Sequence, residues 1–208
     1  MVIAGREPQP RPKGEGSPLD SAHSILPLNA RTEGEPLAFE IDKITESIEN
    51  AETGETLDTL VLPVTQADLK ETTKKNGWLF DWKLEYNQTG HQLYKLVAEQ
   101  DPQTIQGLVS LEELEDHVYM HLIESAPFNI GKGKKYIGVC GNLTAFGCKM
   151  SKEYGFDGVI VFVPKTALIP HYQKTLGAVM ISKRKMAIFE ESAKDLLDKY
   201  FPETEEES

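Results

Sequence analysis

The chain has 208 residues, 39% of them hydrophobic and 26% charged, and its formal net charge at pH 7 is −11. This length suffices for one sizeable core, and no apolar run approaches the roughly 18 residues of a membrane-spanning helix. Such an acidic chain is repelled by a polyanion, so nucleic acid is not an expected partner, whereas a cationic substrate such as an amine suits it. The first residues lack the apolar core of a secretory signal, and we therefore expect a cytoplasmic protein.

Residues 1–35 are predicted to be a mobile tail. They contain Pro8, Pro10, Pro12, Pro18 and Pro27 and few large apolar side chains. Such a composition buries too little surface to offset the entropy lost on ordering. Within this tail, the apolar patch at residues 25–28 could dock onto the domain. Residues 203–208 are predicted to be a solvated acidic tail, which leaves one domain over residues 36–202.

Residues 37–64 fit two patterns. Phe39 and Ile41, and the run at 57–62 after a turn-rich segment, favour strands. Ile41, Ile44 and Ile48 also fit helical spacing, so a helix in the first half stays open.

Next in the chain is a short polar segment followed by aromatic residues. Thr65 and Asp68 have the spacing of a capping box, which predicts a helix that stops at Asn76-Gly77. The aromatic residues after it alternate and indicate a strand or turn packed under the domain, or else a wall of the substrate site. These residues are Trp78, Phe80 and Trp82.

Three strand-like segments follow, over residues 92–99, 104–113 and 117–124. Turn-sized gaps separate them, which predicts an antiparallel meander. The third segment, HVYMHLIE, is apolar on both faces, as expected of a strand in the middle of a covered sheet.

A helix is predicted from Val139 to the stop at Gly155, with an apolar stripe on one face and small residues on the other. The apolar run at 158–163 then predicts a parallel strand, in a βαβ unit with the strand that ends at Glu124. A helix at 166–176 capped by Gly177, strands at 178–182 and 186–189, and a helix at 190–200 complete the domain. Cys140 and Cys148, eight residues apart on one helix, are expected to be reduced packing residues that form neither a disulfide nor a metal site.

The loop between Glu124 and the helix at Val139 is basic and contains glycines. Small residues at a helix start let backbone N–H groups approach a phosphate, with Lys132, Lys134 and Lys135 nearby to offset its charge. The string GKGKK lacks the spacing of a nucleotide P-loop, which excludes a kinase or NTPase.

Residues 92–190 resemble the GCN5-related N-acetyltransferases, the GNAT superfamily. The resemblance is carried by IESAPFN (123–129), YIGVCGNLTAFGCKMS (136–151), GFDGVIVFV (155–163) and HYQKTLGA (171–178). It implies an α/β (α+β) fold in which a central mixed, mostly antiparallel twisted sheet has a V-shaped splay and flanking helices. Residues 92–190 would be the recognisable core, and residues 36–91 a divergent N-terminal part.

The resemblance also implies that acetyl-CoA binds as cosubstrate. Its pyrophosphate would lie on the helix start and its pantetheine arm along the end of the central strand. The implied binding residues are Leu122, Ile123, Lys135, Tyr136, Ile137, Gly138, Val139, Cys140, Gly141 and Asn142. Three positions depart from the family pattern: Lys135 replaces Gln or Arg, Cys140 replaces Gly or Ala, and Lys165 stands where Asn is common. One residue is inserted between Tyr172 and Gly177.

Two residues are candidates for catalysis. Glu124 would take the proton of the amine, or else it anchors the loop or binds the cationic substrate. Tyr172 lies where the family has its general acid, or else it is an amphipathic core residue. Ser125 is a candidate for contact with the substrate, as a hydrogen-bond donor to the acyl oxygen, or else it caps the turn. His121 is a second candidate. It lies on the central strand and His171 lies beside Tyr172, and either could titrate near neutrality, although a histidine on an apolar strand is more often a core residue. No metal is expected.

The predicted function is transfer of an acetyl group from acetyl-CoA to a primary amine, on a small molecule or a peptide, by direct attack. The alternative is a catalytically silent GNAT-like domain that senses a coenzyme A ligand or binds a protein. Residues 37–90 would build the acceptor side. A homodimer stays open, and no membrane contact is expected.

Overall fold

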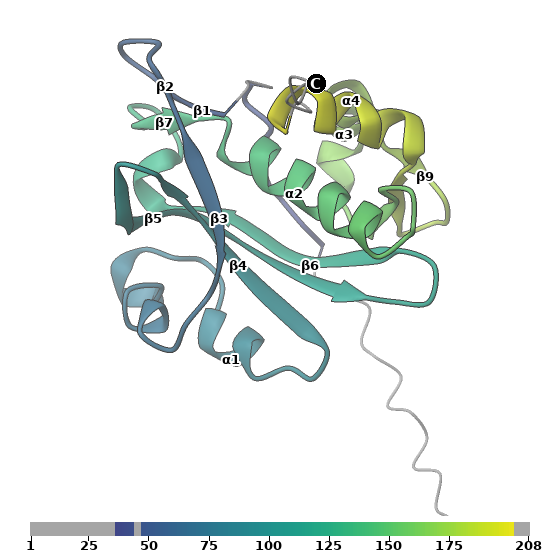
Figure 1. Cartoon of the computed structure of the whole chain (residues 1–208), viewed down its shortest axis with the longest axis horizontal. Helices are drawn as coiled ribbons and strands as arrows, with labels where there is room; N and C mark the ends of the chain where they lie inside the picture. Colours follow the sequence, from purple (N-terminus) through teal and green to yellow (C-terminus); the bar gives the residue numbers. More distant parts are fainter. Residues whose placement is uncertain (1–35, 44–46, 202–208) are drawn as a thin grey trace, which may run out of the picture. The chain divides into compact units, whose positions relative to one another are not determined.

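A seven-stranded mixed sheet carries the fold in the computed structural model, which describes residues 36–43 and 47–201 (Figure 1). In spatial order its strands are β3 (Thr59–Pro63), β4 (His91–Ala98), β5 (Asp101–Glu113), β6 (Val118–Ser125), β8 (Ile160–Phe162), β10 (Met186–Ile188) and β9 (Val179–Met180). Neighbouring strands are antiparallel except β6 and β8, which are parallel. The predicted meander, the βαβ unit and the mixed, mostly antiparallel sheet are confirmed. The expected tails and the apolar patch at 25–28 lie outside the described residues.

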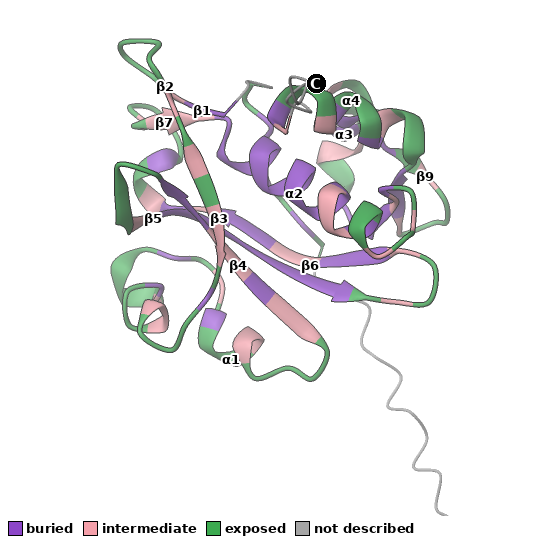
Figure 2. Cartoon of the chain, viewed as in Figure 1, coloured by how far each residue is buried: buried purple, intermediate pink, exposed green. Residues whose placement is uncertain are grey.

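Helices flank both faces of this sheet (Figure 1). One core joins the sheet to α2 (Val139–Glu153), α3 (Ile169–Leu176) and α4 (Glu190–Tyr200), and a second core joins the opposite face to α1 (Trp82–Tyr86). The side of α2 toward the sheet is buried along the helix (Figure 2). Gly138, at φ 87°, begins α2, and Gly155 follows its end as predicted. Of the described residues, no helix is long and apolar enough to cross a membrane.

The divergent N-terminal part is extended rather than helical. Residues 37–43 have no helical turn, and the side chains of Leu37, Phe39 and Ile41 are buried while those between them are exposed. This alternation is that of an extended segment with one apolar face, so the helical alternative is wrong for these residues. A small second sheet follows, formed by β1 (Ile48–Asn50), β2 (Thr56–Leu57) and β7 (Tyr136–Ile137).

The helix predicted before Asn76-Gly77 is wrong. The chain forms two 3-10 turns there, Asp68–Lys70 and Lys74–Asn76. A short polar segment has no apolar stripe with which packing could offset the cost of helix nucleation. The aromatic segment after it is a loop that leads into α1, and Trp78 and Trp82 are buried in the core beneath the sheet.

The capping-box pair nevertheless forms, and it gives a first prediction. The backbone N–H and the hydroxyl of Thr65 both donate to Asp68 Oδ2 at 2.7 Å, and Lys95 Nζ donates to Oδ1 at 2.6 Å. Burial raises the pKa of Asp68, but Lys95 and Thr65 outweigh it and hold this pKa below its ordinary value. A depressed carboxyl pKa contributes stability that is present at neutral pH and is lost as pH falls through the folded-state pKa.

We expect Asp68→Asn to lower the free energy of unfolding by about 1 kcal/mol near neutral pH. The difference from wild type should shrink once pH falls below about 4. Urea denaturation at neutral pH and at a pH below about 4 measures this difference in unfolding free energy. The control for charge is Asp58→Asn, at an exposed position. A deficit that stays constant down to acidic pH would show that the ionised carboxylate is not responsible.

Candidate active site

A splay opens between the two parallel strands at the centre of the sheet. β6 and β8 pair only at Val118↔Ile160 and Tyr119↔Val161. Beyond these pairs β6 continues along β5 to Ser125, with no β8 partner among the described residues. The V-shaped opening expected at the end of the central strand is therefore present.

An irregularity in β6 decides which of its side chains lie on each face of the sheet. The register with β5 shifts so that Leu122 and Met120 pair with adjacent residues, and His121 is the extra residue of a β-bulge. Met120 and Ile123 accordingly both enter the core under α2. Glu124 lies on the opposite face, against α1.

Residues 36–43 lie in this opening. The N–H of Val118 in β6 donates to Val159 O, so this edge of the β8 segment faces β6. Val163 lies four residues further and presents its carbonyl to the same edge, where it accepts from Leu37 N at 2.7 Å. Lys165 N in turn donates to Leu37 O at 2.7 Å, which makes a parallel bridge. The segment thus takes the place next to β8 that β6 vacates.

The segment next contacts α3 through Tyr172. This side chain has no exposed surface. Its hydroxyl accepts from Phe39 N at 3.1 Å and shares its proton between the carbonyl oxygens of Phe39 at 2.9 Å and Leu37 at 3.3 Å. The Phe39 ring stacks on that of Tyr172, with 4.7 Å between centroids. Burial raises the pKa of Tyr172, so its hydroxyl is protonated at neutral pH.

The segment ends on the start of α2. Ile41 N donates to His171 Nε2 at 3.0 Å, and Gly138 N donates to Asp42 Oδ1 at 2.9 Å. Lys134 Nζ donates to the other oxygen of Asp42 at 2.8 Å. The corner expected to hold a phosphate therefore holds a carboxylate, as helix-start N–H groups and a lysine favour.

The other residues of the predicted cradle have different surroundings. Tyr136 and Ile137 form β7 and pair with β1, and Lys135 lies over the Tyr136 ring at 5.1 Å. A Cβ on Gly141 would meet the hydroxyl of Tyr200 and lie 3.6 Å from Lys43 O. The small face of α2 is therefore covered at Gly141 by α4 and by the chain that follows Asp42.

Glu124 is held by the loop that leads into α1. Its carboxylate accepts from Leu79 N at 2.6 Å, Phe80 N at 3.4 Å and Trp82 Nε1 at 2.8 Å. Burial raises the pKa of Glu124 and outweighs the lowering by these donors. These contacts are those of a loop anchor, one of the two alternatives considered for this residue, and its service as a base remains a prediction.

Cys140 and Asn142 lie in the first turn of α2. Ser125 Oγ lies 3.2 Å from Cys140 Sγ, and burial raises the pKa of the Cys140 thiol to about 12, so this thiol is not a nucleophile at neutral pH. Asn142 Nδ2 donates to Thr59 in β3 at 3.2 Å, and in the described part of the chain its buried Oδ1 has no hydrogen-bond partner. Leu122 is half-buried and Ile123 is buried beside the splay.

His121 belongs to a polar cluster on the α1 face. Its Nε2 lies 2.8 Å from Glu112 Oε2, and His91 Nδ1 lies 2.7 Å from Glu85 Oε1. The two imidazole rings stack with 3.8 Å between centroids. Burial lowers the pKa of His121, which favours neutral imidazole.

One metal ion could take His91, Glu112 and His121 only after rearrangement. Their donor atoms lie within 4.8 Å of one another, whereas donors around one ion at bond lengths near 2.1 Å are about 3.0 to 3.4 Å apart. Nearly parallel stacked rings also cannot both aim their lone pairs at one point. The cluster is organised as two hydrogen-bonded histidine–carboxylate pairs.

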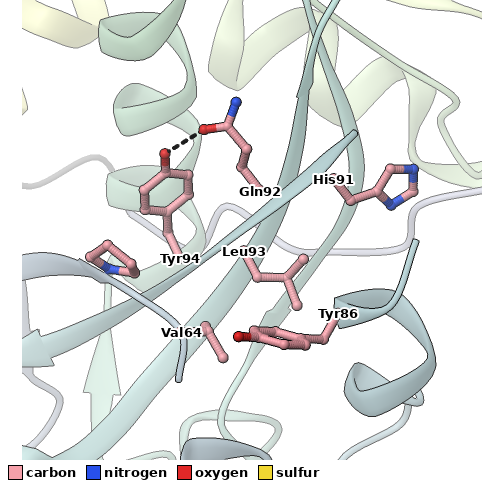
Figure 3. Close-up of a pocket in the computed structure, with 7 residues that line it drawn as sticks. Val64, Tyr86, His91, Gln92, Leu93 and Tyr94 are labelled. Atoms are coloured by element: carbon pink, nitrogen blue, oxygen red, sulfur yellow. Dashed lines mark hydrogen bonds between the residues drawn. The ribbon is translucent and has the colours of Figure 1, made fainter. Parts of the chain in front are cut away.

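A solvent-open hollow of ≈ 430 Å³ lies at the edge of the sheet formed by β3 and β4. Val64, Leu93 and Tyr86 lie together on one side of β4, and Tyr94 and Gln92 lie on the other, joined by a hydrogen bond of 2.8 Å (Figure 3). Pro63, Val64 and Tyr86 of its lining come from residues 37–90, the part predicted to form the acceptor side, and the other lining residues are 91–94 of β4. β5 and β6 separate it from the splay.

Gly107 in β5 allows α2 to begin close to the sheet, which gives a second prediction. A Cβ there would lie 2.6 Å from Val139 Cγ1 and 2.9 Å from the carbonyl oxygen of Glu124. We expect Gly107→Ala to lower the free energy of unfolding by about 2 kcal/mol, because the helix start must move away. The control is Gly147→Ala, whose Cβ would make ordinary contacts from 3.5 Å outward. That change should stabilise the fold by up to about 1 kcal/mol. Equal effects of the two changes in thermal and urea denaturation would contradict this account.

Solved structures that are similar to this chain include acetyltransferases. Spermidine/spermine N-acetyltransferase from Vibrio cholerae is 14% identical, with 66% of this chain and 97% of that chain covered and a TM-score of 0.48. Ribosomal-protein-S18-alanine N-acetyltransferase from Escherichia coli is 11% identical, over 62% of this chain and 90% of that chain, with a TM-score of 0.44. No family model and no curated protein matches the chain.

These TM-scores lie below 0.5, so the assignment of the fold stands on the sheet itself. Its strand order, the single parallel pair, the splay between β6 and β8 and the helix that links them make a mixed, mostly antiparallel sheet with flanking helices. This is the fold that the resemblance of residues 92–190 implies.

Sequence reasoning placed Tyr172 and Gly138 in one site but missed the segment that joins them. The missed contacts are those of Asp42 with Gly138, of Ile41 N–H with His171, and of the backbone of Phe39 with Tyr172. The alternation of Phe39 and Ile41 was visible as a strand pattern. No local signal identified its partner, because the contacting residues lie about 130 positions further along the chain.

Proposed function

We propose that this domain is an N-acyltransferase that transfers an acetyl group from acetyl-CoA to a primary amine by direct attack. The observation that carries the proposal is the arrangement of one groove. What we call the groove is the path filled by residues 36–43, which runs from the β6–β8 splay past the buried Tyr172 hydroxyl to an anion-binding corner at Gly138 and Lys134.

The chemical features of coenzyme A fit this groove. Its pyrophosphate presents oxygen pairs like those of the Asp42 carboxylate, which Gly138 N–H and Lys134 already bind. Its pantetheine arm is an extended chain with amide groups, as is the peptide segment that lies beside β8. Residues 122–124 line the β6 side of the splay and would present the backbone groups that the arm requires.

In the proposed reaction the amine nitrogen attacks the carbonyl carbon of the thioester. The C–N bond forms, the C–S bond breaks, and the thiolate takes the proton of the Tyr172 hydroxyl. The ammonium form of the amine first loses one proton to solvent, and on attack a second proton passes to a base, for which Glu124 is the candidate, directly or through water. The base then releases its proton, and Tyr172 regains one from solvent. The acceptor would be an amine on a small molecule or a peptide. An amine is a cation in water, and the acidic chain attracts cations. The proposed location is the cytoplasm.

A binding module without catalysis is the second candidate, and two observations favour it. Glu124 already accepts three hydrogen bonds, and Asp42 covers the anion-binding corner. A domain of this kind would bind a coenzyme A ligand or a protein and would leave amines unmodified.

Mass spectrometry of amines incubated with acetyl-CoA and the full-length protein distinguishes the two. A polyamine, a free amino acid and a peptide with a free N-terminus form a suitable panel. The transferase proposal expects one acetyl group on at least one of them and an equal amount of free coenzyme A. If acetyl-CoA binds in calorimetry and no amine is acetylated, the second candidate holds. Absence of binding up to about 1 mM, the upper end of ordinary KM values, both to the wild-type protein and to an Asp42→Asn variant in which the carboxylate at the anion-binding corner is neutralised, would refute the transferase proposal.

A further inference from the structure

We infer that the groove is one binding site with two ligands, an extended acidic peptide and the coenzyme, and that residues 36–43 of the chain are that peptide. This inference rests on the proposed function, because it assigns coenzyme A to the same groove. It adds that acetyl-CoA binds only after the segment has left.

The first support is that the segment uses every part of the groove. Leu37 bridges to the end of β8, Phe39 lies against Tyr172, and Asp42 lies on the start of α2. Backbone pairing with alternate side chains in pockets is how an extended peptide is bound at the edge of a strand. The pattern that the groove accepts is apolar at positions 37, 39 and 41, with a carboxylate at 42.

The second support is that the segment covers the groups that the proposed reaction needs. The Tyr172 hydroxyl is shared among three backbone groups of Leu37 and Phe39. Gly138 N–H and Lys134 are paired with Asp42. A thiolate and a pyrophosphate would need these same donors, so the peptide and the coenzyme exclude each other.

The third support is that the contacts of Asp42 are polar, whereas Leu37, Phe39 and Ile41 are buried in the main core. Asp42 is held by one backbone N–H and one lysine, and the Lys134 side chain remains about a quarter exposed, at 26%. Lys43 beside it pairs with Glu49 in β1 at 2.6 Å, outside the groove. Neutralising Asp42 therefore weakens the hold of the segment on the start of α2 and leaves its apolar contacts in place.

Competition sets the apparent affinity of the coenzyme. If the groove is free in only a fraction of molecules, the apparent dissociation constant is the intrinsic constant divided by that fraction. Weakening the segment therefore tightens coenzyme binding, although no coenzyme contact has been added. A residue that only supports the fold would have the opposite effect or none.

Calorimetry with acetyl-CoA on the full-length protein tests this. Asp42→Asn removes the charge that binds Gly138 N–H and Lys134, and we expect acetyl-CoA to bind about tenfold tighter than to wild type. The matched control is Glu40→Gln, an exposed residue of the same segment with the same change of charge. It should leave the affinity unchanged. A synthetic peptide of residues 36–43, added in excess to the Asp42→Asn protein, should weaken coenzyme binding again.

The outcomes separate this inference from the function on which it rests. Equal or weaker binding of acetyl-CoA to Asp42→Asn, or no effect of the peptide, overturns the inference and leaves the proposed function standing. A gain of equal size in Glu40→Gln also overturns it, because general charge would then be the cause. If acetyl-CoA binds to neither variant nor to wild type up to about 1 mM, the proposed function fails and the competition fails with it.

Discussion

Tyr172→Phe should slow acetyl transfer by at least about 100-fold, the usual contribution of a positioned proton donor. The hydroxyl is the only group that the substitution removes, and the ring keeps its stacked contact with Phe39 and its edge-to-face contact with Phe162. The same hydroxyl holds the backbone of Leu37 and Phe39. Its loss should therefore loosen the segment and let acetyl-CoA bind a few times more tightly, by about 1 kcal/mol or less.

Opposite changes in turnover and in coenzyme affinity are the signature of this double role. Single-turnover kinetics measures the chemical step, and calorimetry measures the affinity. Tyr154→Phe is the matched control, because its hydroxyl donates to Gln92 at 3.1 Å, away from the groove. It should change neither quantity. If turnover by Tyr172→Phe stays within about threefold of wild type, the tyrosine serves only packing and segment binding.

The sheet and its helices were predictable because their signals are local. Strand-like segments separated by turn-sized gaps marked β4 to β6, and the continuous run at 158–163 marked β8. Gly155 and Gly177 marked helix ends, and both have the positive φ that makes glycine favourable there.

The parts that could not be predicted depend on distant partners. The helix expected before Gly77 failed because a local capping pair, Thr65 and Asp68, fits a 3-10 turn as well as a helix, and only packing decides between them. The position of residues 37–42 depends on the β6–β8 splay. That opening, where β6 and β8 stop pairing, was expected from the family resemblance, but nothing local in the sequence marks His121 as the bulge or residues 37–42 as the segment beside β8.

The partners of the two catalytic candidates are also distant in the sequence and could not be predicted. Tyr172 lies in α3, within the helix predicted at 166–176, yet its hydrogen bonds run to residues more than 130 positions away. Glu124 was expected at the end of the central strand, where it lies. The bulge turns its side chain toward α1, and the donors it meets come from the loop at 79–82.

Glu124→Ala is expected to lower the free energy of unfolding by about 3 kcal/mol. The substitution leaves the indole N–H of Trp82 and the backbone N–H of Leu79 without their acceptor. Trp82 has no exposed surface, so water cannot replace the lost oxygen at the indole without opening the core. Urea denaturation measures the loss, and Glu113→Ala, at the exposed end of β5, is the control and should cost little.

Glu124→Gln separates anchoring from base catalysis. Glutamine keeps one oxygen acceptor but turns an NH2 group toward an N–H donor, so part of the stability should be lost, about 1 to 2 kcal/mol. If Glu124 is only an anchor, acetyl transfer by the folded variant should match wild type at a temperature where both are folded. If it is the base, transfer should fall by about 100-fold or more under those conditions. The carboxylate already accepts three hydrogen bonds, so its remaining capacity is about one further donor. An amine proton or a bridging water would have to use that last position, which makes the rate of this variant the decisive measurement for the transferase proposal.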